Sequence, residues 1–269
     1  MAGYRLRSWQ KPTVGRVLIT VALDGPAKAA GFEQHRRIES FTRELLEHLT
    51  RAALPATWGV SDPVHAAATP ALENSRILHE VAHEIAVIGD ATWVGPSAGR
   101  PRFAKELARR VNAARAKGLP ASSLLLQKAV LGDDLDLVVK RGITAVCHID
   151  QDGSAPTQTR NPRSLHYGVW EMPPTGHLPT KPGWLAARRL VANIRRVARD
   201  GGFYHMCIAA PAVVSQPAGV RRRLSRVLQD IAKLRDRGLL KVETLAAAAT
   251  RLSDVPATTP QRSLLRQAA

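Results

Sequence analysis

Short apolar segments alternate with longer amphipathic segments along most of the chain. Most of the apolar segments are continuous runs of Val, Ile, Leu and Ala, and do not alternate apolar with polar residues. Continuous runs are typical of strands buried on both faces of a parallel sheet. The pattern predicts strands at residues 16–24, 56–60, 83–90, 122–128, 143–150, 166–173, 203–210 and 240–245.

The longer segments carry apolar residues at helical spacing. In one of them Phe103, Leu107 and Val111 recur every fourth residue, and Gly118 follows the basic last turn. Basic residues in the last turn and a glycine after it are typical of helix ends. The same pattern predicts helices at residues 32–52, 102–118, 133–142, 185–202 and 224–238.

Strands and helices that alternate in this way favour parallel strands joined by crossover helices. The pattern fits an α/β fold, a distorted (β/α) barrel of seven to eight parallel strands, better than the alternative of an open sheet. The chain has 269 residues, of which 45% are hydrophobic, and can therefore bury a sizeable core. We predict a basic N-terminal extension at residues 1–15, a barrel domain at 16–252 and a C-terminal tail at 253–269.

The basic N-terminus contains no apolar segment of the kind found in secretory signals, and no apolar run is long enough to span a membrane. We therefore expect a cytoplasmic protein without a membrane span. The net charge of +17 indicates a polyanionic partner such as nucleic acid. However, the arginines are spread along every predicted helix, as solvated helix faces also are, and no nucleic-acid-binding motif accompanies them.

Charged side chains stand where the predicted strands end. In a (β/α) barrel the carboxyl ends of the strands meet at one mouth, where the chemistry of such proteins lies. Carboxylates gathered there can hold a hard cation or transfer protons. Alternatively, each of them caps the following helix or pairs with an arginine of a loop. The candidate pocket residues are Asp24, Asp90, Trp93, Lys128, Asp150 and Glu171.

The cysteines and histidines give weaker signals. Cys147 and Cys207 lie within apolar runs, so we expect buried, reduced thiols that are not in metal-ligand spacing and form no disulfide. His79 and His83 are four residues apart, but His83 opens a predicted strand, which breaks the helical geometry of a metal pair. His205 lies at the start of a strand, the wrong end for a barrel site, and is expected to be a packed structural histidine. No Gly-rich phosphate loop or nucleophile elbow is present.

Several sequence segments follow one another in the order in which similar segments occur in a known protein family. They are "VLITVALDGPAKAAG", "LLEHLTRAALPATWGV", "HEIAVIGDATW", "LDLVVKRGITAVCHID" and "FYHMCIAAPAVV". Over residues 16 to 250 the chain thus resembles the polysaccharide deacetylases, the NodB-homology or carbohydrate esterase 4 family. The resemblance implies a distorted (β/α) barrel and metal-dependent hydrolysis of the amide bond of N-acetylated sugars. It also implies a divalent cation, usually zinc, held by one Asp and two His, with an Asp as base and a distant His as acid.

Most of these functional positions have changed in this chain. Asp24 stands at the position of the metal-binding aspartate, but the base position is occupied by Leu23. The two metal-binding histidines correspond to Ile88 and Thr92, and the acid histidine to Ala209. A catalytic zinc site needs about three protein ligands, so Asp24 alone is expected to be a relic of such a site. Loss of the base removes a contribution of about 10²–10⁴-fold to the rate.

Three functions follow from these observations. The leading hypothesis is a deacetylase-like barrel that has lost its metal chemistry, has no metal cofactor, and binds a glycan, a sugar derivative or a protein partner. The first alternative is an active hydrolase in which Asp24, Asp90, Asp150 and Glu171 form a rebuilt carboxylate metal site near Lys128. The second alternative is a basic protein that binds nucleic acid or another polyanion through its outer helices.

Overall fold

The computed structural model describes residues 13–24, 32–63, 72, 81–149, 161–179, 184–216 and 218–254. Most of the predicted N-terminal extension and of the predicted tail lies outside the described residues. His79 and Asp150 also lie outside them. Within the described part of the chain, no helix combines the length and the apolar character needed to cross a membrane.

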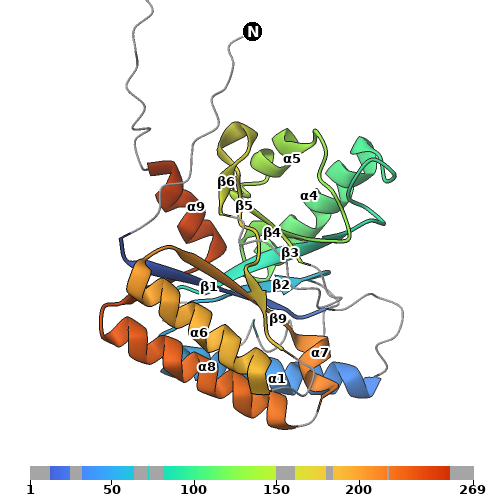
Figure 1. Ribbon diagram of the computed structural model, residues 1–269. Coiled ribbons are helices and arrows are strands. Elements are labelled where there is room, and N and C mark those ends of the chain that lie inside the picture. Colours follow the sequence, from blue (N-terminus) through green and yellow to red (C-terminus); the bar gives the residue numbers. More distant parts are fainter. Residues whose placement is uncertain are drawn as a thin grey trace, which may run out of the picture.

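A curled sheet of mostly parallel strands forms the centre of the molecule (Figure 1). All eight predicted strands are present, although the segment predicted at 166–173 contains only the two-residue strand β7 and a short 3-10 turn. Two further short strands, β6 and β8, complete the sheet. The strands are β1 Gly15–Ala22, β2 Thr57–Val60, β3 Glu84–Asp90, β4 Ala121–Gln127, β5 Ala145–His148, β6 Arg163–Ser164, β7 Trp170–Glu171, β8 Gly176–His177, β9 Phe203–Ala209 and β10 Leu240–Glu243.

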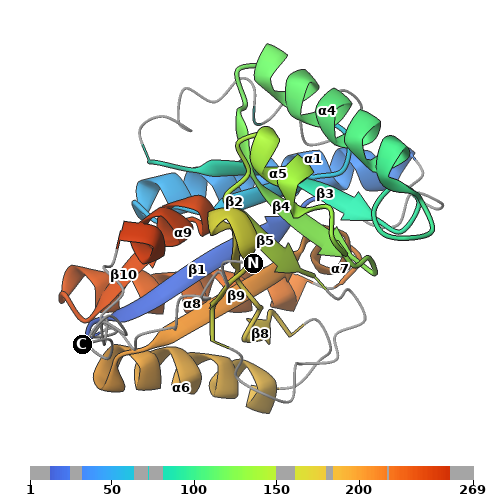
Figure 2. The same ribbon diagram turned by 90° about the horizontal axis from the view of Figure 1, so that it is seen from above.

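The strand order is β6-β7-β5-β4-β3-β2-β1-β9-β8. Strand β10 pairs with the first half of β1, and β2 pairs with the second half. Of the pairings between described strands, only that of β6 with β7 is antiparallel. Among the described residues no pairing joins β6 to β8, so the sheet curls into a half-barrel, as Figure 2 shows, and does not close into a ring. The predicted distorted α/β barrel is confirmed in this open form.

Helices cover both faces of the sheet. In Figure 1, α1, α6 and α8 form a layer on one side, whereas α9 lies on the other. The helix α9 was not predicted, and it continues to Asp254, two residues past the predicted end of the barrel domain. The helices are α1 Phe32–Arg51, α4 Arg100–Ala116, α5 Leu135–Lys140, α6 Trp184–Asp200, α7 Ala210–Val214, α8 Ala218–Asp236 and α9 Leu245–Asp254.

The alternation of side chains along each strand divides the core in two. In β1, Val17, Ile19 and Val21 belong to the outer core, which packs under the helix layer. Leu18 and Ala22 belong to the inner core on the concave face of the sheet. The concave face is filled by the apolar side of α9, which explains why the strands are apolar on both faces. The residues of α9 in this inner core are Leu245, Ala248, Ala249 and Leu252.

Candidate functional site

Four of the candidate pocket residues lie at the carboxyl ends of strands, an edge of the sheet that we call the mouth. Asp24 follows the end of β1, Asp90 is the last residue of β3, Lys128 follows β4, and Glu171 is the last residue of β7. These strands run parallel to one another, so their ends lie at the same edge. The sequence therefore placed these four residues on the correct edge of the sheet.

Asp24 is held by the neighbouring strand. Its Oδ2 atom accepts a hydrogen bond of 2.5 Å from the backbone N–H of Ser61, the residue after β2. Burial raises the pKa of the Asp24 carboxyl above its ordinary value, and the hydrogen bonds from Ser61 only partly offset this effect. Asp24 thus fixes the β2 loop against the end of β1.

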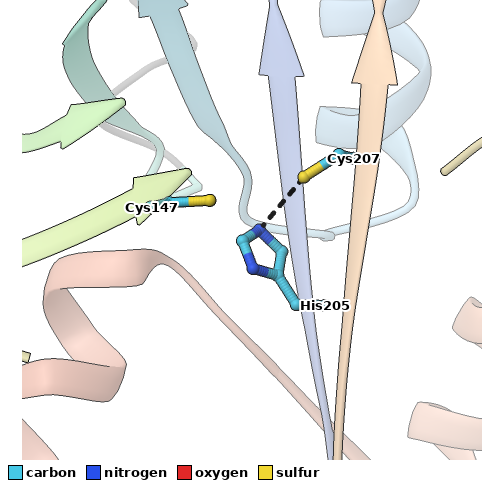
Figure 3. Close-up of side chains that lie close together, drawn as sticks. All are labelled: Cys147, His205 and Cys207. Atoms are coloured by element: carbon cyan, nitrogen blue, oxygen red, sulfur yellow. Dashed lines mark hydrogen bonds between the residues drawn. The ribbon is translucent and has the colours of Figure 1, made fainter. Parts of the chain in front are cut away.

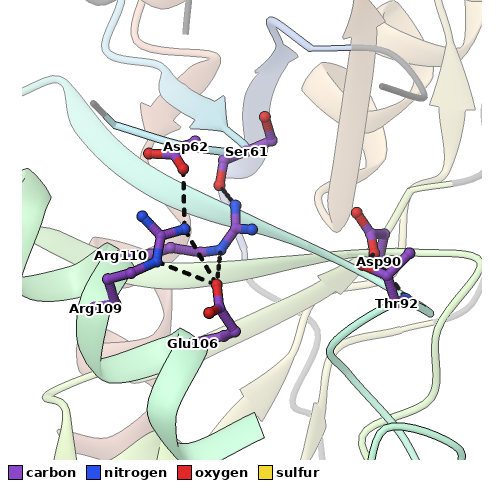
Figure 4. Close-up of polar contacts among 7 residues, drawn as sticks. All are labelled: Ser61, Asp62, Asp90, Thr92, Glu106, Arg109 and Arg110. Atoms are coloured by element: carbon purple, nitrogen blue, oxygen red, sulfur yellow. Dashed lines mark hydrogen bonds and ion pairs between the residues drawn. The ribbon is translucent and has the colours of Figure 1, made fainter. Parts of the chain in front are cut away.

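Asp90 closes a tight turn at the end of β3. Its Oδ1 atom accepts hydrogen bonds from the backbone N–H of Thr92 at 2.8 Å and from the Thr92 hydroxyl at 2.5 Å. In Figure 4 this pair lies apart from the ion pairs made by Arg109 and Arg110 of α4. Such local side-chain to backbone bonds are typical of aspartates that shape a turn.

The arginines of α4 bind the loop after β2. Arg109 forms ion pairs with Asp62 at 2.9 Å and with Glu106 at 3.1 Å (Figure 4). Arg110 donates a hydrogen bond to the carbonyl oxygen of Ser61. The loop that holds Asp24 is therefore itself held by α4, so this part of the mouth is a structural network.

Trp93 lies beneath α4 and does not line the mouth. Its side chain is 1% exposed and stacks on Phe103 with ring centroids 5.9 Å apart. The guanidinium of Arg110 covers the ring at 4.8 Å from its centroid. Trp93 thus belongs to the outer core, where its indole gives a cation–π contact to Arg110.

Glu171 and Lys128, the other two described candidate residues, differ in their surroundings. Glu171 is buried and forms an ion pair with Arg163, and its Oε1 atom lies 3.7 Å from His148 Nε2. Lys128 is exposed and has a left-handed backbone conformation with φ of 51°. Among the described residues, no three carboxylates or histidines of the mouth are close enough to share a metal ion.

Apart from Asp24, the positions that correspond to the deacetylase machinery carry no carboxylate and no histidine. Leu23 is fully buried in the outer core, on the side of β1 opposite to Asp24. Ile88 is 1% exposed in the inner core, and the Thr92 hydroxyl is bonded to Asp90. Ala209 ends β9. The described residues at the mouth therefore do not fit the zinc ion that the resemblance implies.

Two other features of the structure have a distinct chemical character. The first is a buried cluster of Cys147, His205 and Cys207 on the concave side of the sheet (Figure 3). Both cysteines are buried without a disulfide and His205 is fully buried, as expected. Their meeting was not predicted, although residues 205 and 207 must share one face of a strand.

The second feature is a basic groove between α6 and α8, with a volume of about 750 Å³. We call it the arginine groove. The sequence showed that both helices are basic, but not that their arginines line one cavity. The groove is lined by Ala187, Arg188, Val191, Ala192, Arg195, Arg196, Arg199, Arg223, Arg226, Val227 and Asp230.

Comparisons with known proteins identify the fold. No model of a known protein family matches the chain, and no curated protein matches it. A solved structure described as a glycoside hydrolase/deacetylase from Parabacteroides distasonis is similar, with a TM-score of 0.62 at 10% identity over 89% of this chain and 72% of that one. The PuuE allantoinase is similar with a TM-score of 0.60 at 12% identity, over 91% of this chain and 92% of that chain.

A 4-alpha-glucanotransferase from Thermococcus litoralis is also similar, with a TM-score of 0.61 at 12% identity over 89% of this chain. This chain spans only 40% of the length of that enzyme. At these identities the comparisons establish the fold alone. The chain has the curled α/β barrel of the NodB-like glycoside hydrolase/deacetylase structures, as the sequence resemblance predicted.

Proposed function

We propose that this protein binds an acidic glycan in the arginine groove and does not deacetylate sugars by the NodB metal mechanism. The observation that carries the proposal is the composition of the groove, whose lining holds six arginines and four small apolar residues. A guanidinium group binds carboxylate, sulfate and phosphate groups through paired hydrogen bonds. A sugar polymer that carries such groups therefore matches the lining.

The two helices contribute to the groove in complementary ways. Four of its arginines lie on α6 and two on α8, and Asp230, the one carboxylate among the described lining residues, pairs with Arg195 at 3.1 Å. Val191 and Ala192 add apolar surface to the lining, against which the C–H faces of sugar rings can pack. Positive charge beside apolar surface suits a charged sugar better than a neutral one.

Within the part of the chain that the structure describes, Asp24 belongs to no group of three potential metal ligands, which supports the second half of the proposal. A hydrolytic zinc ion needs about three protein ligands, and the Asp24 carboxylate accepts a hydrogen bond from the Ser61 backbone. The alternative of a rebuilt carboxylate metal site is also disfavoured, because Asp90 accepts hydrogen bonds from Thr92 and Glu171 is paired with Arg163. We expect no acetate release from N-acetylated oligosaccharides in the presence of zinc, magnesium, manganese or calcium.

Nucleic acid is the second candidate ligand, favoured by the net charge of +17 and by the same groove. The preference for a glycan rests on analogy with the fold, which is shared with structures described as a glycoside hydrolase/deacetylase and a 4-alpha-glucanotransferase. The two thiols, which form no disulfide, suit the cytoplasmic location that the sequence suggests.

Calorimetric titration of the full chain tests the proposal. The ligands are a carboxylated oligosaccharide, its uncharged counterpart, and single-stranded and duplex nucleic acid, each at several salt concentrations. We expect binding of the carboxylated sugar that weakens with salt, and a loss of about ten-fold or more in affinity when Arg196 and Arg226 are both replaced by Ala.

The matched control replaces Arg102 and Arg115 of α4 by Ala, which removes the same charge from another exposed helix. Equal losses in the two double variants would show that only net charge matters and would contradict a site in the groove. Tighter binding of nucleic acid than of the sugar would favour the second candidate. Acetate release that disappears in Asp24→Asn would instead support a rebuilt catalytic site.

A further inference from the structure

Three potential metal ligands meet inside the barrel. The Sγ atoms of Cys147 and Cys207 and a ring nitrogen of His205 all lie within 4.8 Å of one another. The distance from His205 Nε2 to Cys207 Sγ is 3.6 Å. Figure 3 shows the three side chains pointing toward a common space between the strands. A tetrahedral zinc ion with Zn–S of about 2.3 Å and Zn–N of about 2.0–2.1 Å separates such S and N atoms by about 3.5–3.6 Å.

The curvature of the sheet creates this cluster. His205 and Cys207 are two residues apart on β9 and therefore share its concave face, whereas Cys147 lies on β5. Five strand-to-strand steps separate β5 from β9 along the sheet, which amounts to about 24 Å. The three donor atoms meet only because the sheet curls back on itself, so the cluster connects two distant strands across the hollow.

The surroundings of His205 orient it as a ligand. Its Nδ1 atom is 3.1 Å from the carbonyl oxygen of Met172. A carbonyl can only accept, so the Nδ1 atom carries the proton and the lone pair of a neutral ring lies on Nε2, toward the thiols. This arrangement is the usual support of metal-binding histidines. The Thr20 hydroxyl, 2.8 Å from Nε2, provides an oxygen atom on the same side.

We propose that Cys147, His205 and Cys207 bind one zinc ion inside the barrel, with the Thr20 hydroxyl or a water molecule as the fourth ligand. Two thiolates and one imidazole are ligands that zinc prefers. The three protein ligands are at most 5% exposed, so the ion enters as the chain folds and then joins β5 to β9. The proposal is independent of ligand binding in the arginine groove.

The cluster is separate from the family's metal position. Thr20 lies beside Cys207 in the β1–β9 register, whereas Asp24 is four residues further along the chain. Four residues of a strand span about 13 Å, so Asp24 cannot reach an ion held by the two thiolates. Replacement of Asp24 therefore distinguishes the two metal positions.

Elemental analysis of the full chain tests the proposal. The reduced protein is refolded with zinc, freed of excess metal and measured beside its variants. We expect about one zinc ion per chain, and a loss of about ten-fold or more in Cys147→Ser, Cys207→Ser and His205→Gln. The matched controls Asp24→Asn and His148→Gln, the latter next to Cys147 on β5, should keep the metal.

X-ray absorption of the unmodified protein gives a second readout that does not depend on the folding of a buried variant. Zinc bound as proposed has two sulfur neighbours at about 2.3 Å. A protein without zinc, a zinc ion without sulfur neighbours, or retention of zinc in Cys207→Ser would each overturn the proposal. Loss of zinc in Asp24→Asn but not in Cys147→Ser would place the metal at the mouth instead.

Discussion

His83 makes the stability of the fold dependent on pH in a way that can be calculated. It lies just before β3, and its Nδ1 atom accepts a hydrogen bond of 3.1 Å from the backbone N–H of Ala56. The Nε2 atom is 3.4 Å from the hydroxyl of Thr50, and the ring meets Trp58 edge-on at 5.9 Å. Because the N–H of Ala56 can only donate, the ring is neutral with its proton on Nε2.

Protonation of His83 would add a proton to Nδ1, which would then face the backbone N–H of Ala56, so that two donors would oppose each other. Burial is the main cause that lowers the pKa of His83 from 6.5 to about 4. The unfolded chain takes up the proton near pH 6.5, whereas the folded chain resists it until about pH 4. The contribution is therefore present above pH 6.5 and is lost as the pH falls to 4. Its size is about 2–3 kcal/mol, after allowance for the partial exposure of the ring.

Urea unfolding at several pH values between about 7.5 and about 4 measures this contribution. The variant His83→Asn keeps an acceptor for the Ala56 N–H but does not titrate. We expect the free energy of unfolding of the unmodified protein to fall by about 2–3 kcal/mol more than that of His83→Asn over this range. The control His148→Asn removes a half-exposed histidine and should follow the unmodified protein. Parallel curves for the unmodified protein and His83→Asn would refute the reasoning.

Two further predictions concern the concave face. Glu84 is buried and accepts hydrogen bonds from Thr57, Ser123 and the backbone N–H of Ala246. The variant Glu84→Ala leaves these donors without an acceptor, so we expect the free energy of unfolding in urea to fall by about 3 kcal/mol. A loss below about 1 kcal/mol would show that water replaces the carboxylate. At Gly59 an added methyl group would overlap a side-chain carbon of Leu125. We therefore expect Gly59→Ala to lower the free energy of unfolding by about 1–3 kcal/mol. An unchanged melting temperature would contradict the close packing of Leu125 on Gly59.

The sequence pattern predicts strands well because the strands of this fold are apolar on both faces. The predicted segment 83–90 differs from β3 only by its first residue, and 122–128 is shifted by one residue from β4. A continuous apolar run between helices leaves little room for another assignment. The ends of α6 and α8 were located for a different reason, since glycines follow the basic last turns.

The helix α9 was missed because the apolar run before it passes into its alanines with little interruption. Only Thr244 separates β10 from the helix Leu245–Asp254, and its hydroxyl accepts a hydrogen bond of 3.3 Å from the N–H of Ala247. A distant residue also holds the start of α9, since Glu84 accepts a hydrogen bond from the N–H of Ala246, 162 positions away. A contact of that range cannot be inferred from the spacing of apolar residues.

The mouth could be predicted in part. That Asp24, Asp90, Lys128 and Glu171 lie on one edge follows from the parallel order of the strands. Which side chains converge there depends on loop contacts such as the hydrogen bond from Ser61 to Asp24, and these have no local sequence signal. The type of residue told more about catalysis than its position in the fold. Leu23 has no group that can accept a proton, so it cannot act as the catalytic base whatever its geometry.

The cluster on the concave face shows where sequence reasoning could have gone further. The alternation of a strand places His205 and Cys207 on one face, and the inner face of β5 carries Cys147 between Ala145 and Ile149. A flat sheet would keep β5 and β9 about 24 Å apart, and only a curled one brings them together. The sequence signal for the curl is the small residues of the inner face, Ala22, Gly59, Ala86 and Ala145. Because small side chains allow the sheet to bend tightly, these residues help to bring the thiols within reach of the imidazole.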